Sequence, residues 1–334
     1  MASFSKFGND LYTGARSFNI VGRRRIWFSI AAVLVLIAVI VPLVRGFQFG
    51  IEFRGGSEFT VSALGNNPDQ SKATDAVNAV VPGQGDVARV SVVGGNAVRV
   101  QTSQLTTAQT QKIADELASM YNVKPRDITS SFIGPSWGAD ITTQAIRALV
   151  IFVILAGVVM ALYFRTWKMS VAAIIALLHD LVITAGVYAV LGFEVTPAAV
   201  IGFLTILGYS LYDTVVVFDK IRETTAEDGD SSRRTFADSV NLAVNQTLVR
   251  SINTSVVALL PVGSILFIGA VVLGAGTLRD ISLALFVGIL AGTYSTIFIA
   301  APLYSLLRER EPEQLKSTKK KAATTARATT GAVR

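Results

Sequence analysis

Long apolar stretches, each long enough to cross a bilayer, dominate the pattern of this chain. They occupy residues 26–44, 148–164, 169–193, 195–218, 252–276 and 281–307. A membrane-spanning helix needs about 20 largely apolar residues. The only ionisable side chains of the acid, base or histidine type inside these stretches are His179, Asp180 and Asp213. We therefore predict a membrane protein, an all-α bundle of six transmembrane helices.

A different pattern fills residues 47–144, between the first and second apolar stretches. Residues 57–63, 87–93, 97–101 and 127–133 have strand character, whereas residues 69–80 and 106–121 have helical periodicity. Gly94-Gly95-Asn96 is a strong turn signal between the two middle strands. The order β-α-β-β-α-β matches the ferredoxin-like pattern, so this segment is predicted to form an α+β domain. Its acidic residues form no catalytic constellation, and no enzyme activity is expected.

The distribution of lysine and arginine predicts the orientation in the membrane. Basic residues mark the N-terminal segment 1–25, the 165–168 turn, the 220–234 loop and the tail 308–334. Short basic connections lie on the cytoplasmic side. We predict cytoplasmic termini and an extracytoplasmic domain at 47–144. Helix 1 spans residues 26–44 and is retained rather than cleaved, because the stretch is long for a signal peptide. Helices 2–6 lie within residues 145–307.

Composition supports a membrane protein and excludes several kinds of site. The chain is 51% hydrophobic and 16% charged, against about 25% charged in soluble proteins. The absence of cysteine and the single histidine argue against disulfides, thiolate chemistry and histidine-rich metal sites. No metal and no cofactor are therefore expected. The net charge of +7 comes mostly from the tail, which would bind anionic lipid or RNA by charge alone, so no specific nucleic-acid partner is predicted.

Asp213 is the strongest candidate for chemistry within the membrane. An ionised carboxylate in the bilayer costs about 3 kcal/mol on insertion scales, so such residues usually face inward and serve a function. Arg250 begins the fifth helix at a depth similar to that of Asp213, so the two side chains are candidates for an ion pair. The alternatives are a structural hydrogen bond for Asp213 and an arginine that extends to the membrane surface for Arg250.

His179 and Asp180 lie midway along the third apolar stretch. An imidazole next to a carboxylate can take part in a proton relay. Adjacent residues project about 100° apart on a helix, so the two side chains cannot face one neighbour equally. Structural packing is the alternative interpretation of this pair.

Two polar motifs flank the apolar stretches. Gly50, Glu52, Arg54, Gly55 and Gly56 follow the first helix, where the glycines permit a tight turn and the two charges can stabilise it electrostatically. Asp219 and Arg222 belong to a charged turn after the fourth helix. Solvated charges at a helix end are the alternative for this second motif.

Several of these motifs, in this order, resemble the SecF family of the bacterial SecD–SecF protein-export complex. The resemblance extends from the first helix to the sixth, and the segments that carry it are residues 49–56, 134–138, 179–180, 207–223, 245–255 and 288–295. The family belongs to the resistance–nodulation–division superfamily of proton-driven transporters. It places a functional aspartate and arginine at the positions of Asp213 and Arg250. This chain departs from the family at Glu52 and Arg54, where aspartate and often lysine are usual, and at Tyr212, where asparagine is usual.

The resemblance implies an accessory subunit of the Sec export machinery in the bacterial cytoplasmic membrane. It would use the proton-motive force together with a SecD-like subunit to promote the passage of secreted preproteins through the Sec translocation channel. Proton-motive force is a sufficient energy source, since the chain has no phosphate-binding loop. The alternatives are a half-size proton-driven exporter of lipids or drugs and a non-transporting membrane scaffold.

Overall fold

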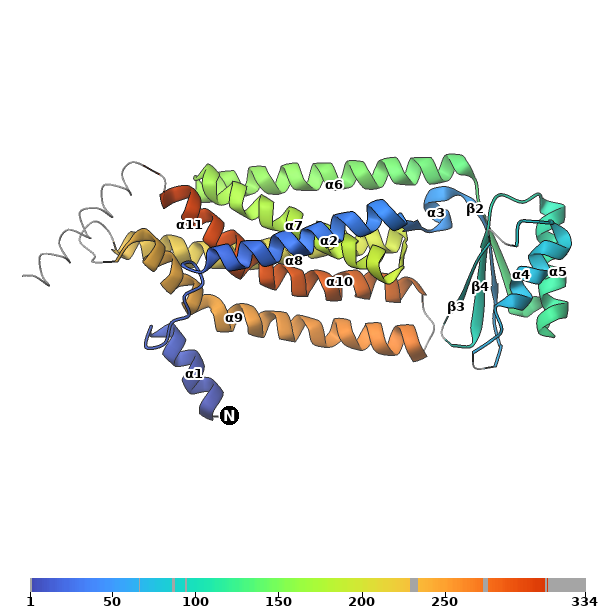
Figure 1. Cartoon of the computed structure of the whole chain (residues 1–334), viewed down its shortest axis with the longest axis horizontal. Helices are drawn as coiled ribbons and strands as arrows, with labels where there is room; N and C mark the ends of the chain where they lie inside the picture. The colour runs from blue at the N-terminus through green and yellow to red at the C-terminus, as the bar shows by residue number, and fades with distance from the viewer. Residues whose placement is uncertain are drawn as a thin grey trace, which may run out of the picture.

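The molecule is an elongated helix bundle with a β domain at one end (Figure 1). The computed structural model describes residues 2–65, 67–85, 88–93, 95–228, 234–272, 276–309 and 311. The predicted tail at 308–334 therefore lies almost wholly outside the described residues.

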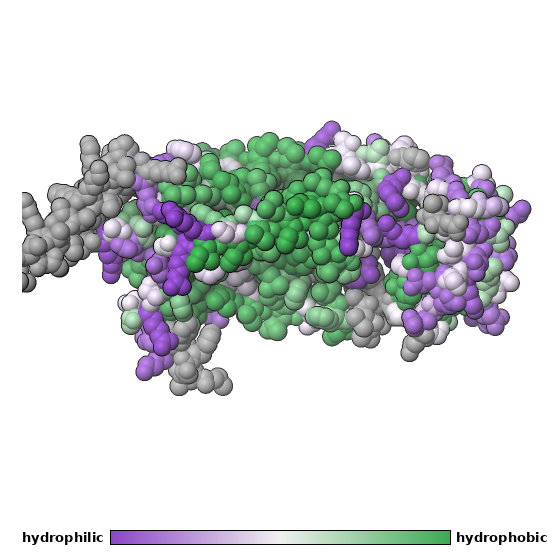
Figure 2. All heavy atoms as spheres, in the orientation of Figure 1, coloured by the Kyte–Doolittle hydropathy of each residue, from purple (hydrophilic) through white to green (hydrophobic). Residues whose placement is uncertain are grey.

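Among the residues that the structure describes, six helical segments are long and apolar enough to span a membrane, as the sequence predicted. Two of them contain π-helical stretches, η2 and η3. The segments are α2 (Arg24–Arg45), α6 (Pro135–Phe164), α7 (Trp167–Leu191), α8 (Pro197–Asp228), α9 (Phe236–Ser264) with η2 (Ile265–Val272), and α10 (Gly276–Ser295) with η3 (Thr296–Ala300) and α11 (Ala301–Glu309). On the face that Figure 2 shows, a belt of apolar side chains covers this bundle between two more polar ends.

Three helices extend well beyond the predicted apolar stretches. Helix α6 begins within the segment that was assigned to the external domain, and α9 begins long before residue 252. Helix α8 continues through the predicted charged turn, where Lys220 and Glu223 form an ion pair one helical turn apart. A search for bilayer-length apolar runs detects only the apolar part of a helix. It misses amphipathic extensions, such as the start of α9, where a capping box on Thr235 begins the helix.

The β domain (residues 56–133) contains a four-stranded antiparallel sheet. The strands lie in the order β3 (Arg89–Val93), β4 (Ala97–Thr102), β2 (Gly56–Val61) and β5 (Ile128–Ile133). Helix α4 (Ser71–Val80) follows β2, and helix α5 (Thr107–Tyr121), with the short 3-10 turn η1 (Pro125–Asp127), precedes β5. The elements thus follow one another in the order read from the sequence, and a capping box on Thr106 begins α5. Gly94 of the predicted turn lies outside the described residues.

Both helices of the β domain pack on one face of the sheet and leave the other face toward the bundle (Figure 1). Phe59, Val98 and Val100 point into this small core together with Ile113 and Leu117 of α5. Polar residues occupy the alternate strand positions, including Glu58, Arg99 and Gln101, because successive side chains on a strand point to opposite faces. The uncovered face is therefore polar.

Two short strands and a short helix lie between the β domain and the bundle. Strand β1 (Gln48–Phe49) and the short helix α3 (Ile51–Arg54) link α2 to the sheet. Strand β6 (Glu194–Val195), between α7 and α8, pairs in parallel with β1.

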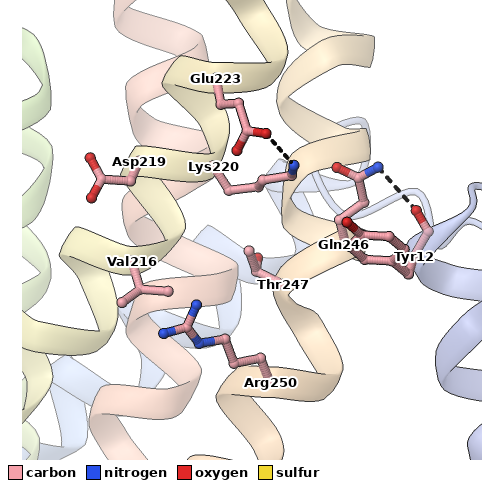
Figure 3. A pocket seen from close by; sticks show the side chains of 8 residues that line it. All are labelled: Tyr12, Val216, Asp219, Lys220, Glu223, Gln246, Thr247 and Arg250. Atoms are coloured by element: carbon pink, nitrogen blue, oxygen red, sulfur yellow. Dashed lines mark hydrogen bonds and ion pairs between the residues drawn. The ribbon is translucent and has the colours of Figure 1, made fainter.

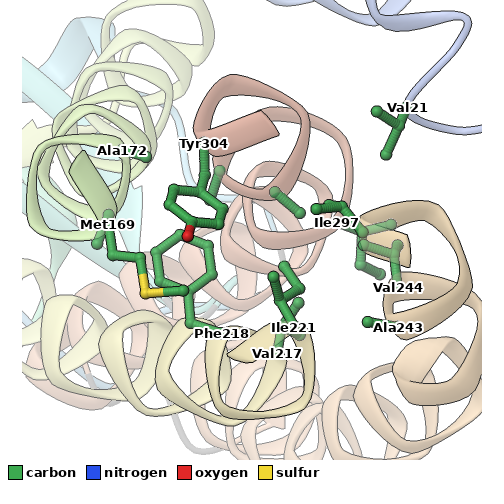
Figure 4. Packing of buried hydrophobic residues seen from close by; sticks show 14 of the residues in the cluster. Val21, Met169, Ala172, Val217, Phe218, Ile221, Ala243, Val244, Ile297 and Tyr304 are labelled. Carbon is green, nitrogen blue, oxygen red and sulfur yellow. The ribbon is translucent and has the colours of Figure 1, made fainter. Parts of the chain in front are cut away.

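At the far end of the bundle, the helices share a large apolar core (Figure 4). Phe218, Tyr304 and Phe236 meet there at ring-centre distances of 5.7 and 5.8 Å. The segment predicted as an N-terminal extension contains a helix, α1 (Ala2–Tyr12), whose Leu11 is fully buried in this core. Polar side chains of α9 bind the segment that follows α1. The side-chain oxygens of Asn241 and Asn245 accept hydrogen bonds from the backbone N–H groups of Ile20 and Phe18. The core therefore fixes α1 and the segment after it against α9.

Candidate functional site

Close contact between α8 and α10 sets the geometry of the bundle interior. A Cβ atom at Gly202 of α8 would lie 2.6 Å from the Cβ atom of Ala284, and one at Gly288 of α10 would lie 2.3 Å from Ile206. Small residues let the two backbones approach, as is usual between membrane helices. The contact continues to Ser210, which faces Gly292 of α10. Asp213, three residues later on α8, faces Ser251 of α9 instead.

Asp213 is buried where α8 meets α9. Its residue is 6% exposed, and its Oδ1 accepts a hydrogen bond of 2.9 Å from the Ser251 hydroxyl. Within the described part of the chain, its Oδ2 is buried and has no hydrogen-bond partner. The Tyr209 hydroxyl, one turn away, lies near Ser255 of α9. The site thus retains an unused acceptor at Asp213 among the described residues.

The expected ion pair between Asp213 and Arg250 is not formed among the described residues. Ser251, the neighbour of Arg250 on α9, occupies the position facing Asp213. Because adjacent residues project in different directions, the Arg250 side chain points to a more exposed region. The guanidinium is still near enough to act on the Asp213 carboxyl electrostatically.

A cavity of about 440 Å³ surrounds the Arg250 side chain. It lies between α8 and α9 and is closed on one side by the end of α1, where Gln246 donates to the Tyr12 carbonyl (Figure 3). Arg250 reaches from α9 toward Val216 of α8. The lining residues are Tyr12, Val216, Asp219, Lys220, Glu223, Gln246, Thr247 and Arg250. The arginine therefore lines a cavity that several charged side chains border, and it also acts on the nearby Asp213 carboxyl.

Asp180 is the most buried carboxylate of the bundle, at 0% exposure. Its Oδ2 accepts hydrogen bonds from Ser210 of α8 at 2.5 Å and from Ser295 of α10 at 2.8 Å. Its Oδ1 lies 3.2 Å from Nδ1 of His179. The carboxylate thus joins three helices.

His179 is buried beside Asp180 and faces Tyr294, with ring centres 6.1 Å apart. Its Nε2 atom has no hydrogen-bond partner in the part of the chain that the structure describes. One ring nitrogen therefore contacts the carboxylate while the other stays available. The arrangement accommodates both interpretations of the pair, structural packing and a proton relay.

The motif after the first helix builds the neck between bundle and β domain. Gly55 and Gly56 have φ values of 72° and 135°, and a Cβ at Gly56 would lie 2.4 Å from the Thr102 carbonyl oxygen. Gly50 is the N-cap residue of α3. Within the described residues Arg54 forms no direct ion pair with Glu52. Arg54 is exposed, whereas Glu52 turns inward.

Burial raises the pKa of the Glu52 carboxyl above its usual range. The nearby carboxylates of Glu58 and Glu194 act in the same direction, and the Arg99 guanidinium opposes them. Three glutamate carboxylates therefore lie close together in the neck. Even so, no group of three or more histidine and acidic side chains in the described ranges is suited to hold a metal ion.

The second motif lies on the helical extension of α8. Asp219 accepts a hydrogen bond of 2.9 Å from the Tyr163 hydroxyl of α6. Arg222 is exposed nearby. Asp219 thus connects α6 and α8. A charge that was only solvated at a helix end would not need this contact.

Sequence reasoning missed Ser251 and Ser295 as partners of the two buried carboxylates, and it missed Glu194 in the short α7–α8 connection. Serine is common in membrane helices, so its spacing alone marks no partner. An acidic residue in a short connection that lacks basic residues was a usable signal for Glu194.

Comparison with known families identifies two matches. Residues 112–310 match the family described as protein export membrane protein SecD/SecF, C-terminal. Residues 40–63 match the SecD/SecF GG motif, which covers the neck glycines. The two matches together include the neck and five of the six candidate spans.

The chain is also similar to curated proteins named protein translocase subunit SecF. The one from Streptomyces coelicolor is 45% identical over 321 residues, which cover 96% of this chain and 84% of the relative. The one from Mycobacterium tuberculosis strain H37Rv is 43% identical over 312 residues, covering 91% of this chain and 70% of the relative.

A crystal structure of SecDF from Thermus thermophilus, described as a translocon-associated membrane protein, is similar in fold. It aligns with a TM-score of 0.77 at 31% identity and covers 88% of this chain. This chain spans only 39% of that longer protein. A second SecDF structure, in a super-membrane-facing form, aligns with a TM-score of 0.63.

Proposed function

Because the chain belongs to the SecD/SecF family of protein export membrane proteins, we propose that it converts proton-motive force into work on secreted proteins. Members of the family are protein translocase subunits, which are transport components of the Sec pathway. The six candidate spans of the described residues make this chain a multi-pass membrane protein. The specific proposal is that Asp213, assisted by Arg250, is the proton-coupling group. His179 and Asp180 are proposed as a relay pair in the same set, in which the Nε2 atom of His179, without a partner among the described residues, is the group that exchanges a proton.

The observation that carries this proposal is the incomplete hydrogen bonding of Asp213. A buried carboxylate that serves only to join helices is normally satisfied at both oxygens. Asp180 follows that rule, with two serine donors on one oxygen and His179 at the other. Asp213 has one donor, and Arg250, which acts on its carboxyl electrostatically, lines a neighbouring cavity. This leaves room for a proton to bind at Oδ2, with the cavity as its route.

A SecD-like subunit is the partner that we propose. The support is the length of the Thermus thermophilus SecDF protein, of which this chain matches 39%. The remaining length must carry the SecD-like part. The Sec translocation channel and secreted preproteins are proposed as further partners, since that protein is described as translocon-associated.

The proposed location is the bacterial cytoplasmic membrane, with membrane lipid around the apolar belt and both termini in the cytoplasm. In this orientation the β domain, with its β-α-β-β-α-β order, is an extracytoplasmic ferredoxin-like domain. The boundaries that we propose follow the structure, with the domain at residues 56–133. The similarity to SecF subunits does not favour a lipid or drug exporter.

Substitution of Asp213 tests the proposal. Asp213→Asn keeps the side-chain volume and can still bond to Ser251, but it cannot exchange a proton. We expect it to abolish the proton-motive part of export in membrane vesicles while assembly with the SecD-like subunit stays unchanged. Asp213→Glu should retain part of the activity, and Arg250→Met should lose it.

The neutral double variant Asp213→Asn/Arg250→Met separates a proton site from a structural bridge. Because the structure has no direct ion pair between the two residues, we expect the double variant to stay inactive. Recovery of export in the double variant, or normal proton-dependent export in Asp213→Asn at parental abundance, would refute the mechanism and leave a scaffold role.

A further inference from the structure

The connection between the two helices that bear the buried carboxylates is attached to the β domain. Strand β6 follows α7, which carries Asp180, and precedes α8, which carries Asp213. Gln48 and Phe49 of β1 pair with Glu194 and Val195, and the Gly50 N–H donates to the Val195 carbonyl at 3.0 Å. Any displacement of the α7–α8 connection therefore acts directly on the neck.

The side chain of Glu194 extends this attachment to the sheet itself. Glu194 is 9% exposed. It accepts a hydrogen bond of 3.1 Å from Gln101 of β4 and lies 3.6 Å from the Arg89 guanidinium of β3 and 3.9 Å from that of Arg99. All three partners belong to the uncovered polar face of the sheet, which faces the bundle (Figure 1).

Glu58 of β2 shares the same partners from the other side. Its carboxylate accepts from the Gln101 amide at 3.0 Å and lies 3.6 Å from Nε of Arg99. We call Glu58, Arg89, Arg99, Gln101 and Glu194 the neck cluster. Four of its members come from the sheet, and Glu194 alone comes from the helix bundle. The ion pairs are half-buried, so removing Glu194 leaves the guanidinium groups of Arg89 and Arg99 with less compensation, and opening the contact costs free energy.

Helix α10 strengthens the bundle side of this joint. The Thr196 hydroxyl, directly after β6, donates to Asp280 at 2.9 Å, and the Tyr188 hydroxyl of α7 donates to the Asp280 carbonyl at 2.6 Å. The ends of α7, α8 and α10 nearest the β domain are therefore tied together around β6. They are expected to move as one unit.

From this arrangement we propose that Glu194 is a positioning residue that transmits displacement of α7 and α8 to the β domain. The neck cluster stays closed throughout the transport cycle and acts as a rigid link, not as a latch that opens. This inference rests on the proposed proton-coupling function, because proton binding at Asp213 supplies the displacement. It gives the polar face of the sheet a role of its own, which is to receive the displacement of α7 and α8 through Glu194.

A covalent substitute for the cluster tests the proposal, and the absence of native cysteine makes the test clean. Glu194→Cys is expected to lower the proton-motive part of export by about fivefold or more, the lower end of typical coupling between sites. Assembly and proton-independent export should stay at parental levels. In Glu194→Cys/Gln101→Cys, bridging of the two thiols with a short bifunctional methanethiosulfonate reagent should restore the lost part, and reduction should remove it again.

Two controls accompany the bridged variant. Asp115→Asn removes an exposed carboxylate from α5, on the far side of the sheet, and should leave export unchanged. Glu194→Gln retains an acceptor for Gln101 but loses the charge, and should fall between the parent and Glu194→Cys. It also keeps the proposal testable if the cysteine variants fold poorly.

Two results would overturn the inference. One is parental proton-dependent export in unbridged Glu194→Cys at normal abundance, and the other is inhibition of export by the bridge, which would mean that the contact must open. Asp213→Asn in the same assay distinguishes the two proposals. If Asp213→Asn loses proton-dependent export while Glu194→Cys keeps it fully, only the rigid link is overturned. If Asp213→Asn keeps full proton-dependent export, the proton-coupling function and the rigid link are both overturned.

Discussion

The buried carboxylates differ in the donors that surround them, and these differences determine what each can do. Asp180 meets two serine hydroxyls and an imidazole, whereas Asp213 meets one serine. Glu52, outside the spans, has a buried oxygen without a hydrogen-bond partner among the described residues and lies near two other acids. Its protonation therefore affects stability in a way that can be measured.

Glu52→Gln should stabilise the protein at neutral pH. Because burial raises the folded-state pKa of Glu52, the folded chain binds more protons than the unfolded chain between the ordinary and the raised pKa. Stability therefore falls as pH rises through that window. We expect the glutamine variant to melt about 1–3 °C higher than the parent at neutral pH, with the difference vanishing below the ordinary carboxyl pKa of about 4.3.

Thermal unfolding in detergent, followed across pH, measures this difference. Asp75→Asn, at an exposed position on α4, is the matched control and should give the same melting difference at every pH. A melting difference for Glu52→Gln that does not change with pH would contradict the prediction.

At the scale of elements, the close approach of α8 and α10 positions the interior polar groups. Ile206 packs against Gly288, and Ser210 lies one turn further along the same contact. The hydrogen bond from Ser210 to Asp180 therefore depends on the distance between the two helices. Separating the helices should weaken it.

Gly288→Val should destabilise the bundle by about 1–3 kcal/mol, because its Cβ would lie 2.3 Å from Ile206 and the helices must separate. Gly208→Ala is the matched control on α8, since a Cβ there meets no atom within 4 Å. We expect that control to match or exceed the parent in stability. Equal melting temperatures for parent and Gly288→Val would show that the contact is not tight.

For the whole molecule, the polar β domain and the far end of the bundle should lie on opposite sides of the membrane. The apolar belt separates them on the face that Figure 2 shows. Basic side chains such as Arg23, Arg25 and Arg165 are exposed near the far end, which fits a cytoplasmic location.

Single-cysteine labelling with an impermeant reagent checks this orientation. Ser71→Cys, on exposed α4, should react only from outside the cell, and Ala226→Cys, near the end of α8, only from the cytoplasmic side. The opposite pattern at both positions would invert the topology. Reaction of both cysteines from one side would contradict the six-span arrangement.

The amino-acid pattern was sufficient for features that depend on residues close together in the chain. Apolar length identifies six helices, since the energy of crossing a bilayer is set by about 20 consecutive residues. Alternation and turn residues likewise place the strands and helices of the β domain, and Thr106 marks the start of α5. The burial of Asp213 follows from its place in an apolar stretch.

The partners of the buried groups required the folded molecule, because they join residues far apart in the sequence. Ser251 rather than Arg250 faces Asp213, which depends on the rotation of α9 about its axis. Glu194 meets Gln101 across 93 positions of the chain. Local periodicity limits which face of an element is polar, but only the packing of one element on another decides which polar groups meet.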